Sequence, residues 1–448
     1  MSDNFNKLNN KTLSARAKVI LVIEEILNGK SLSSHLEPLL VSVGDNNRGF
    51  VHEMLLGTLR QWWALARITD SLIERPVSDK GVLAALHIGL YQLLYMNTAE
   101  YAAINDTVNA LKELNKDYGT GLVNAILRKV QKSADKYRKK VQKNHSLPNW
   151  LAKELKQDWP MVYDELGTSL RQPAPIFLRT NAKFTTLDNY LVLLNNCNVD
   201  FKVVPLGVSD EHGILLKDVI KIKNLPNFLQ GHVSVQDRHA QILGHLLKSV
   251  NPPKNFRMLD ACTAPGGKLT QVLELAASGV FHVEHITALD SDSERLKRVH
   301  DNLSRSQVAG MADVICADGT TYQADAPFDV IVLDAPCTAT GVIRRHPDIA
   351  LLRTKDDVQQ TVELQAEILQ NLWQNLAVGG HLLYVTCSLL KAENATQIEN
   401  FLAKTPNAAA VDFTLTLPNQ IKQSVGYQCL PLSKDDGDGF YYAVLQKR

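Results

Sequence analysis

The chain has 448 residues, which is enough for two or three domains that each bury a core. Its 48 Lys and Arg nearly balance its 47 Asp and Glu, so the net charge does not indicate a nucleic-acid partner and only the distribution of charge can. The six cysteines are few and lack the paired spacing of zinc fingers, so we expect no disulfide framework and no metal site, but reduced thiols in a cytoplasmic protein.

Residues 1–145 are predicted to form an all-α bundle. Residues 1–12 are polar, and no run in the chain approaches the ~18 apolar residues of a membrane span, so we expect neither secretion nor membrane insertion. Apolar residues then recur at helical spacing over residues 19–27 and 83–94, whereas the alternation typical of strands is scarce.

The bundle ends in a basic run over residues 128–143. The run holds eight Lys or Arg and one acidic residue, Asp135, a local balance of 8 − 1 = +7. This charge favours a phosphate-binding face, with a solvated helix flank as the alternative. Pro148 cannot continue a helix, so residues 146–150 are expected to separate two domains.

Residues 146–235 mix helix-like stretches, such as 150–159, with short apolar strands, such as 176–178, and predict a small α+β linker domain. Residues 236–448 instead alternate strands with helical segments, which is typical of a mostly parallel Rossmann-like sheet with helices on both faces. The expected strands are residues 256–259, 286–289, 314–316, 330–333, 382–386 and 441–445.

One helix of this last domain has a clear period. Residues 358–376 place Leu364, Ile368, Leu372 and Leu376 on one stripe. Gly379 and Gly380 are expected to end this helix before the next strand.

The first predicted strand of the sheet runs into a glycine-containing loop over residues 260–268. Its candidate ligand-binding residues are Cys262, Thr263, Ala264, Pro265, Gly266, Gly267 and Lys268. Glycines directly after a strand let the backbone approach a ligand, and the next helix offers its amino end. The loop matches neither a G-x-G-x-x-G fingerprint nor a P-loop, so a tight turn is the alternative to a nucleotide-like ligand.

Three aspartates follow the next strands in turn. Asp290 comes 23 residues after Gly267, a spacing that suits a carboxylate on a ribose diol. Asp318, after the third strand, is placed to accept from an adenine amino group, and Asp334 ends the fourth. Each aspartate alone has a turn or helix cap as its alternative, but the series favours a cofactor site.

Two cysteines also lie at strand tips. Cys337 ends the run 329–337, and Cys387 ends the run 381–387. A buried strand that stops at a thiol places that thiol at the carboxyl edge of the sheet, where open α/β folds bind ligands. The pair therefore indicates chemistry, with two buried core thiols as the alternative, and spacing does not distinguish their roles because both are expected near Lys268 or Arg344.

These segments resemble a known family. The loop 260–268, the run Asp334-Ala335-Pro336-Cys337 and the run Thr386-Cys387-Ser388 are similar to the signature segments of S-adenosylmethionine-dependent RNA cytosine-C5 methyltransferases. Residues 234–237 and 341–349 resemble the bacterial branch of that family that acts on small-subunit rRNA, and residues 101–108 and 123–129 are similar to its NusB-like helical domain. Thr263 departs from the usual alanine and leaves the glycines and Lys268 intact.

The resemblance implies a class I methyltransferase that uses S-adenosylmethionine as cofactor. It also implies that Cys387 attacks carbon 6 of the cytosine and that Cys337 assists release, because carbon 5 becomes a nucleophile only after a thiolate has added to carbon 6. Asp334 then hydrogen-bonds the N3 and amino edge, and Lys268 orients the base or the cofactor. Cys262 is expected to be a packing residue.

The resemblance implies three domains: a NusB-like RNA-binding domain over residues 1–145, the linker domain over 146–235 and the catalytic domain over 236–448. The implied substrate is a loop or single-stranded cytosine in 16S rRNA, bound by a monomer whose basic run, Arg344 and Arg345 grip phosphates. The alternatives are another RNA, such as tRNA, and a non-enzymatic RNA-binding or antitermination factor.

Overall fold

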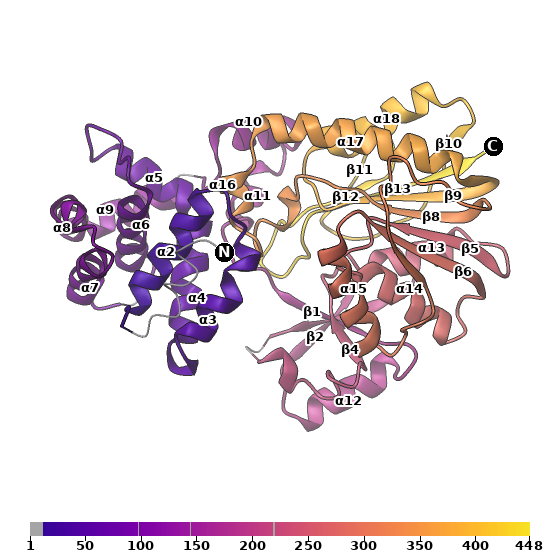
Figure 1. Ribbon diagram of the computed structural model, residues 1–448, viewed down its shortest axis with the longest axis horizontal. Coiled ribbons are helices and arrows are strands. Elements are labelled where there is room, and N and C mark those ends of the chain that lie inside the picture. Colours follow the sequence, from indigo (N-terminus) through magenta and orange to yellow (C-terminus); the bar gives the residue numbers. More distant parts are fainter. Residues whose placement is uncertain (1–11, 97, 144, 218–219) are drawn as a thin grey trace. The chain divides into compact units, whose positions relative to one another are not determined.

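The computed structural model describes residues 12–96, 98–143, 145–217 and 220–448. The chain forms two compact units, of which the first contains Met1–Gln172 with Ile343–Thr354 and the second contains Pro173–Val342 with Lys355–Arg448. Figure 1 shows a helical first unit and a second unit built on two sheets. The domain boundaries expected after residues 145 and 235 remain predictions.

The described part of the first unit is helical, as predicted. Its helices are α2 (Ala15–Leu27), α3 (Leu36–Ser42), α4 (Asp45–Arg60), α5 (Trp62–Asp70), α6 (Lys80–Leu94), α7 (Glu100–Glu113), α8 (Thr120–Gln131), α9 (Ala134–Lys143), α10 (Asn149–Asp158), α11 (Tyr163–Ser169) and α16 (Ile349–Leu352), with the 3-10 turns η1 (Leu32–Ser34) and η2 (Asp117–Gly119). The predicted stripes of α2 and α6 are confirmed, since Val22, Ile23, Leu86 and Leu90 are fully buried. These two helices are buried on most of their faces and form the core of the bundle.

The first unit also includes a segment from far along the chain. Asp348 Oδ2 accepts from Leu32 N over 2.9 Å, and Trp63 Nε1 donates to Ala350 O over 2.9 Å. Arg344 is fully buried, and its Nη1 lies 3.2 Å from Ser169 Oγ. The interpretation of Arg344 as a phosphate-binding residue is therefore wrong, because a fully buried side chain does not reach the phosphates of an RNA at the surface.

The second unit begins with a four-stranded antiparallel sheet in the order β2-β3-β1-β4. Its elements are β1 (Ile176–Thr180), α12 (Leu187–Asn196), β2 (Phe201–Pro205), β3 (His212–Leu216), η3 (Ile222–Asn224) and β4 (Val233–Val235). Tyr190 and Leu194 of α12 pack with Leu178 and Ile214 of the sheet in one buried cluster. The α+β character expected for this region is confirmed.

The large sheet has nine strands in the order β11-β12-β13-β9-β8-β5-β6-β7, with β10 paired to β13. The strands are β5 (Phe256–Ala261), β6 (Val283–Asp290), β7 (Asp313–Cys316), β8 (Phe328–Asp334), β9 (Leu376–Thr386), β10 (Ala408–Ala410), β11 (Gln420–Lys422), β12 (Tyr427–Cys429) and β13 (Phe440–Lys447). The strands from β7 to β9 run parallel, and β13 is antiparallel to β9. All six predicted strands are confirmed within longer bounds.

Helices cover both faces of this sheet, as predicted (Figure 1). They are α13 (Ile242–Ser249), α14 (Gly267–Ala277) and α15 (Ser293–Arg305) on one face, and α17 (Lys355–Gln374) and α18 (Ala395–Lys404) on the other, with η4 (Thr340–Val342) and η5 (Lys391–Glu393) in loops. Successive residues of β8 point to opposite faces, so Val330 and Val332 pack against the first set and Ile331 and Leu333 against the second. A strand buried on both faces is apolar throughout, which is why its sequence was recognisable.

The end of α17 differs from the prediction. Leu376 pairs with Phe328 and already begins β9, and Gly379 and Gly380 lie within that strand instead of ending the helix. The pairing of β8 with β9 shifts register next to Phe328, a bulge that accommodates the glycines. Leu364 is 40% exposed and does not join the buried stripe.

Among the residues that the structure describes, no helix is both long enough and apolar enough to cross a membrane.

Candidate active site

The candidate site lies at the carboxyl edge of the large sheet. β5 lies between β6 and β8, and the three strands run parallel, so the chain connections diverge on the two sides of β5. In open α/β sheets such a switch point forms the crevice in which ligands bind. The loop after β5 and the residues at the ends of β6, β8 and β9 meet there.

The loop after β5 is shaped for a ligand that approaches the backbone. Gly266 has a φ of 93°, which side chains other than hydrogen rarely permit, and its N–H donates to Thr263 O over 2.7 Å. α14 begins directly afterwards, and a Cβ added at Gly267 would meet nothing nearer than Gln236 Nε2 at 3.9 Å. The backbone at the amino end of α14 is thus not crowded at Gly267, which fits the close approach of the expected nucleotide-like ligand.

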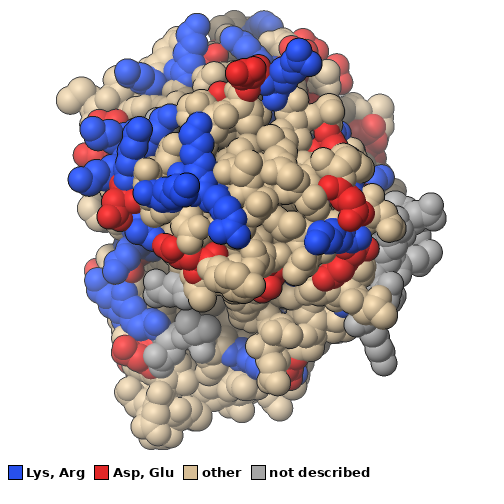
Figure 2. Space-filling view, turned by 90° about the vertical axis from the view of Figure 1, so that its left-hand side faces the viewer, with Lys and Arg blue, Asp and Glu red and all other residues tan. Residues whose placement is uncertain are grey.

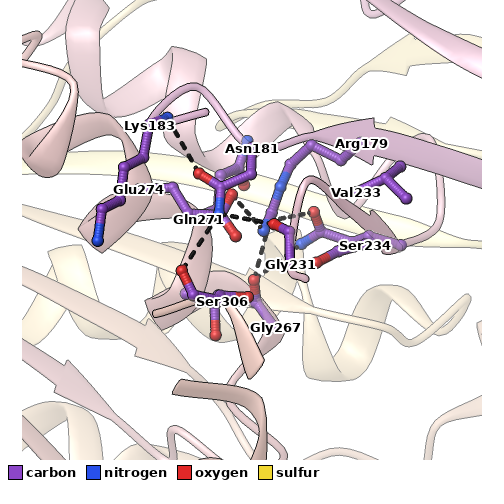
Figure 3. A network of polar contacts seen from close by, with 12 residues as sticks. Arg179, Asn181, Lys183, Gly231, Val233, Ser234, Gly267, Gln271, Glu274 and Ser306 are labelled. Carbon is purple, nitrogen blue, oxygen red and sulfur yellow. Dashed lines mark hydrogen bonds and ion pairs between the residues drawn. The ribbon is translucent and has the colours of Figure 1, made fainter. Parts of the chain in front are cut away.

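A buried arginine of the small sheet holds the first turn of α14 (Figure 3). Arg179 in β1 donates from Nη1 to Gly267 O over 3.1 Å and from Nη2 to Glu274 Oε2 over 2.8 Å. The side chains of Arg179 and Glu274 are 7% and 2% exposed. Gln236 accepts from the same Nη1 over 2.6 Å and donates to Gly267 O over 3.3 Å. This link between the two sheets was not predicted, because nothing in the sequence singles out Arg179.

Replacing Arg179 with methionine is expected to destabilise the second unit by about 3–5 kcal/mol, because Glu274 would keep a buried charge without its partner. The Arg179→Met, Glu274→Met double variant should recover most of that loss. Urea unfolding gives the free energies. The matched control is Lys217→Met, which breaks the exposed ion pair with Asp435 and should cost under about 1 kcal/mol; equal losses in Arg179→Met and Lys217→Met would contradict the assignment.

Two of the predicted cofactor aspartates differ in their surroundings. Asp290 is buried, and its Oδ2 accepts from Ala264 N over 3.1 Å, which ties the loop to β6. Asp318 is exposed after β7, and the hydrogen bonds of its Oδ1 with the backbone and hydroxyl of Thr320 lower its pKa. The other Asp318 oxygen accepts no hydrogen bond from the residues that the structure describes, which fits a ligand donor. The ribose and adenine roles remain predictions.

Asp260 is a carboxyl group of the site that the sequence did not single out. It lies at the end of β5, is 1% exposed, and accepts from Thr263 Oγ1. Its pKa is raised from 3.8 to about 7, mainly by burial and also by the charge of Asp334, while the hydrogen bond from Thr263 acts to lower it. Asp260 is therefore partly protonated near neutral pH.

Stability is expected to depend on pH through Asp260. Its folded pKa lies above its ordinary value, so its stabilising contribution is complete below about pH 4 and is lost as the pH rises through about 7. The Asp260→Asn variant stays neutral and should gain stability relative to wild type between pH 5.5 and pH 8.5, by about 2 kcal/mol.

The measurement is urea unfolding at the two pH values. Asp318→Asn is the control, because the pKa of Asp318 is lowered, so this carboxyl group is ionised at both pH values and its replacement should change stability equally at the two. A pH-independent difference between Asp260→Asn and wild type would contradict the raised pKa.

The two strand-tip cysteines lie side by side. Cys337 follows β8, Cys387 follows β9, and their Sγ atoms are 3.5 Å apart. Both are free, partly exposed thiols. The hydrogen bond with Cys387, and then burial, raise the pKa of Cys337 well above its ordinary value of 9.0. Cys337 therefore keeps its proton at neutral pH while the two sulfurs are in contact.

A lysine–aspartate pair lies beside these thiols. Lys268 Nζ is 2.7 Å from Asp334 Oδ2 and 5.1 Å from the centroid of the Phe440 ring. Burial acts to lower the pKa of Lys268, but the charge and hydrogen bond of Asp334, together with the charge of Cys387, raise it. Lys268 is therefore a fixed cation, and a cation near a thiol favours the thiolate.

The loop thiol Cys262 has a different environment. Its backbone is left-handed, with φ of 60°, and burial followed by the charge of Asp334 raises its pKa to about 12. A thiol with such a pKa is a poor nucleophile at neutral pH. The fold thus brings Cys337, Cys387, Lys268 and Asp334 together and gives Cys262 the character of a packing residue.

Three family models match the chain. Residues 247–446 match the 16S rRNA methyltransferase RsmB/F model, residues 13–132 match the NusB family, and residues 147–223 match the ferredoxin-like domain of RsmF/B-like methyltransferases. These matches identify the helical unit as NusB-like and the small sheet as ferredoxin-like.

Curated relatives are similar over the whole chain. Ribosomal RNA small subunit methyltransferase B of Pseudomonas putida is 37% identical, over 98% of this chain and 99% of its own. The protein of the same name from Pasteurella multocida is 39% identical, over 97% and 96%. The crystal structure of PH0851 superimposes with a TM-score of 0.76 at 20% identity, over 97% of this chain and 99% of that one, which shows a shared fold.

The site and these relatives agree. The loop after β5 fits the methyl donor S-adenosylmethionine, which is the cofactor of these enzymes. The chain belongs to the 16S rRNA methyltransferase RsmB/F family.

Proposed function

We propose that the protein methylates carbon 5 of a cytosine in 16S rRNA through a covalent bond between Cys387 and carbon 6. The observation that carries the proposal is the contact of the Cys337 and Cys387 sulfurs, 3.5 Å apart, beside the Lys268–Asp334 pair. Transfer to a nitrogen or oxygen atom, which has a lone pair, needs no thiol, whereas the electron-poor carbon 5 of a cytosine becomes a nucleophile only after a thiolate has added to carbon 6.

Cys387 is the nucleophile in this proposal. Its thiolate adds to carbon 6, the electron pair of the ring double bond moves to carbon 5, and carbon 5 takes the methyl group from the sulfonium of the donor. Lys268 stabilises the thiolate before the attack, since the charges of these two groups act on each other.

Cys337 handles the proton that must leave. After methyl transfer, carbon 5 carries both the methyl group and a proton, and loss of that proton re-forms the ring double bond and expels Cys387 as a thiolate. In the adduct Cys387 is bonded to carbon and has no charge, so one of the causes that raise the pKa of Cys337 is gone. Cys337 then loses its own proton to solvent, accepts the carbon-5 proton and passes it on.

Asp334 and Lys268 hold the base. Asp334, at the end of β8, lies 2.7 Å from Lys268 as a carboxylate, so it accepts from the amino group of the cytosine and, once N3 carries a proton, from N3. Lys268 supplies the positive charge that offsets the negative charge developing in the ring. The backbone of residues 262–267, with Lys268, Asp290, Asp318 and Asp334, is the proposed cofactor-binding set. The donor supplies the electrophilic methyl group, and these residues bind and orient it.

The RNA substrate has its target base outside a duplex. Reaching two thiols at a sheet edge requires an unstacked base, which costs a few kcal/mol in a helix and least in a loop. Because the proposed substrate is bacterial rRNA, we place the reaction in the cytoplasm. We also expect the enzyme to act as a monomer.

The basic run is the proposed phosphate-binding face of the NusB-like domain. It lies at the end of α8 and along α9, where Tyr137 and Val141 are buried and every Lys or Arg except Lys140 is exposed. Figure 2, which looks onto this end of the helical unit, shows Lys and Arg side chains gathered on the surface to which α8 and α9 contribute. The solvated-flank alternative predicts no effect of these charges on RNA binding.

Reversing three charges tests this face. The Lys136→Glu, Lys139→Glu, Lys143→Glu variant should bind rRNA about 10- to 100-fold more weakly at 0.1 M salt, and the slope of log K against log salt should fall by about 2. Filter binding over a salt series measures both quantities. Affinity for S-adenosylmethionine is the control and should not change; an unaltered salt slope would assign phosphate binding to another surface.

The test of the proposed function uses tritiated methyl donor with purified 16S rRNA and tRNA. We expect labelled 5-methylcytosine in the rRNA and one bisulfite-resistant rRNA position missing from cells that lack the protein. Label in tRNA alone would favour the second substrate, and absence of label in both RNAs would favour the non-enzymatic alternative.

A further inference from the structure

Glu393 binds both cysteine loops at once. Its Oε1 accepts from Thr338 N over 2.7 Å, and its Oε2 accepts from Thr338 Oγ1 over 2.6 Å and from Ser388 Oγ. Thr338 directly follows Cys337, and Ser388 directly follows Cys387. One carboxylate therefore joins the two segments that carry the thiols.

The burial of Glu393 is costly. The residue ends η5, just after β9, and is 0% exposed. A buried carboxylate is unfavourable unless hydrogen bonds compensate for lost hydration, and here a backbone N–H and two hydroxyl groups converge on it. A neutral side chain would fill the same volume without that cost, so simple packing does not explain a carboxylate at this point.

Further hydrogen bonds join the same two loops. Gly341 N donates to Cys387 O over 2.9 Å, and Leu389 N donates to Thr340 Oγ1 over 2.9 Å. Thr340 Oγ1 also lies 3.2 Å from Ser388 Oγ. The loops after β8 and β9 are thus held together by several hydrogen bonds. Glu393 contributes a charged group to this link, and it binds the residues that directly follow the two cysteines.

We propose that Glu393 is a positioning residue that fixes the sulfur atoms of Cys337 and Cys387 at contact distance by clamping the two loops together. This inference rests on the proposed function, in which Cys337 takes the carbon-5 proton while Cys387 is bonded to carbon 6. Both thiols act on the same base, at the adjacent carbons 5 and 6, so a displacement of either loop separates attack from release.

The charge of Glu393 has a second effect in the same direction. It is one of the causes that raise the pKa of Cys337, after the hydrogen bond with Cys387 and burial. The clamp therefore favours the protonated form of Cys337 before the base binds.

The Glu393→Gln variant tests the clamp by kinetics. The amide has the same shape, but its nitrogen cannot accept from the hydroxyls of Thr338 and Ser388. We expect kcat to fall about 100-fold, as for a displacement near 1 Å, while KM for RNA and for the methyl donor changes by less than about twofold. Glu399→Gln, which removes an equal charge from the exposed face of α18, is the matched control and should behave as wild type.

Phenylarsine oxide gives a readout that does not depend on activity. Its arsenic(III) condenses with two neighbouring thiols, forming two As–S bonds with loss of one water. In the RNA-free wild-type protein it should bridge Cys337 and Cys387, located by peptide mass spectrometry, and in Glu393→Gln this capture should slow about tenfold.

The outcomes separate this inference from the proposed function. Wild-type kcat and capture rate in Glu393→Gln would overturn the clamp. If phenylarsine oxide reacts more slowly with Glu393→Gln but the wild-type protein methylates no cytosine, the clamp is supported and the proposed methylation is refuted. If circular dichroism shows that Glu393→Gln does not fold, Thr338→Val removes one of the three hydrogen bonds and should slow both capture and kcat, whereas wild-type values would overturn the inference.

Discussion

Replacing Cys387 with serine is expected to abolish methylation, whereas replacing Cys337 with serine should leave the enzyme covalently bound to its RNA. A serine hydroxyl stays protonated near neutral pH, so Cys387→Ser lacks the nucleophile that must add to carbon 6. Cys337→Ser keeps that nucleophile and loses the group that receives the carbon-5 proton, so the adduct forms, accepts the methyl group and does not break down. Turnover of Cys337→Ser should fall about 100-fold or more.

Denaturing gels with labelled RNA and labelled methyl donor distinguish the two variants. A slowly migrating RNA–protein band that carries the methyl label is expected for Cys337→Ser and no such band for Cys387→Ser. The matched control is Cys316→Ser, which alters an exposed thiol at the end of β7 on the same sheet edge and should turn over normally. A trapped band in Cys387→Ser instead would reverse the roles of the two thiols.

Replacing Asp334 with asparagine is expected to lower kcat by about 100- to 1,000-fold, because the base loses the carboxylate that orients it and Lys268 loses the partner that holds its positive charge near the ring. The alkaline limb of the pH–rate profile should also shift, so that the variant loses activity at a lower pH than wild type as the pH rises. Burial alone lowers the pKa of Lys268 and the charge of Asp334 opposes it, so removal of that charge lets Lys268 deprotonate earlier as the pH rises.

A pH series of single-turnover rates measures both effects. Asp329→Asn is the control, since Asp329 lies at the opposite end of β8, where it accepts from Arg257 N over 2.9 Å. Asp329→Asn should keep the wild-type pH profile. If Asp334→Asn has a normal rate and a normal pH profile, Asp334 has no role in the mechanism. If the rate is normal but the alkaline limb is shifted, the role of Asp334 is only to hold Lys268.

The strands of the large sheet were predictable because their apolar residues form local patterns in the sequence. β5, β8 and β9 are buried on both faces, so they appear in the sequence as continuous apolar runs. Two of these runs end at Asp334 and at Thr386, shortly before a cysteine, which indicates that the cysteines lie at the edge of the sheet. α2 and α6 were predictable for the same reason, since a helix buried on most faces has apolar residues at every helical spacing.

The errors have physical causes in long-range pairing. Leu376 fits the stripe of α17, but pairing with Phe328 across the sheet draws it into β9. Arg344 has the charge of a phosphate-binding residue, but the segment that carries it packs into the helical unit, where Trp63 donates to Ala350 O. Neither partner is near in sequence, so no local pattern reports the contact.

The sequence by itself determined the strand-tip thiols, the glycine loop and the aspartates of the candidate site, because residue type and strand periodicity are local properties. Only the tertiary structure decided that the two sulfurs touch, that Arg179 holds the first turn of α14, that Asp260 has a raised pKa and that Glu393 joins the two cysteine loops. Each of these depends on which groups share a buried, weakly polarisable environment, and that is fixed by the packing of segments far apart in the chain.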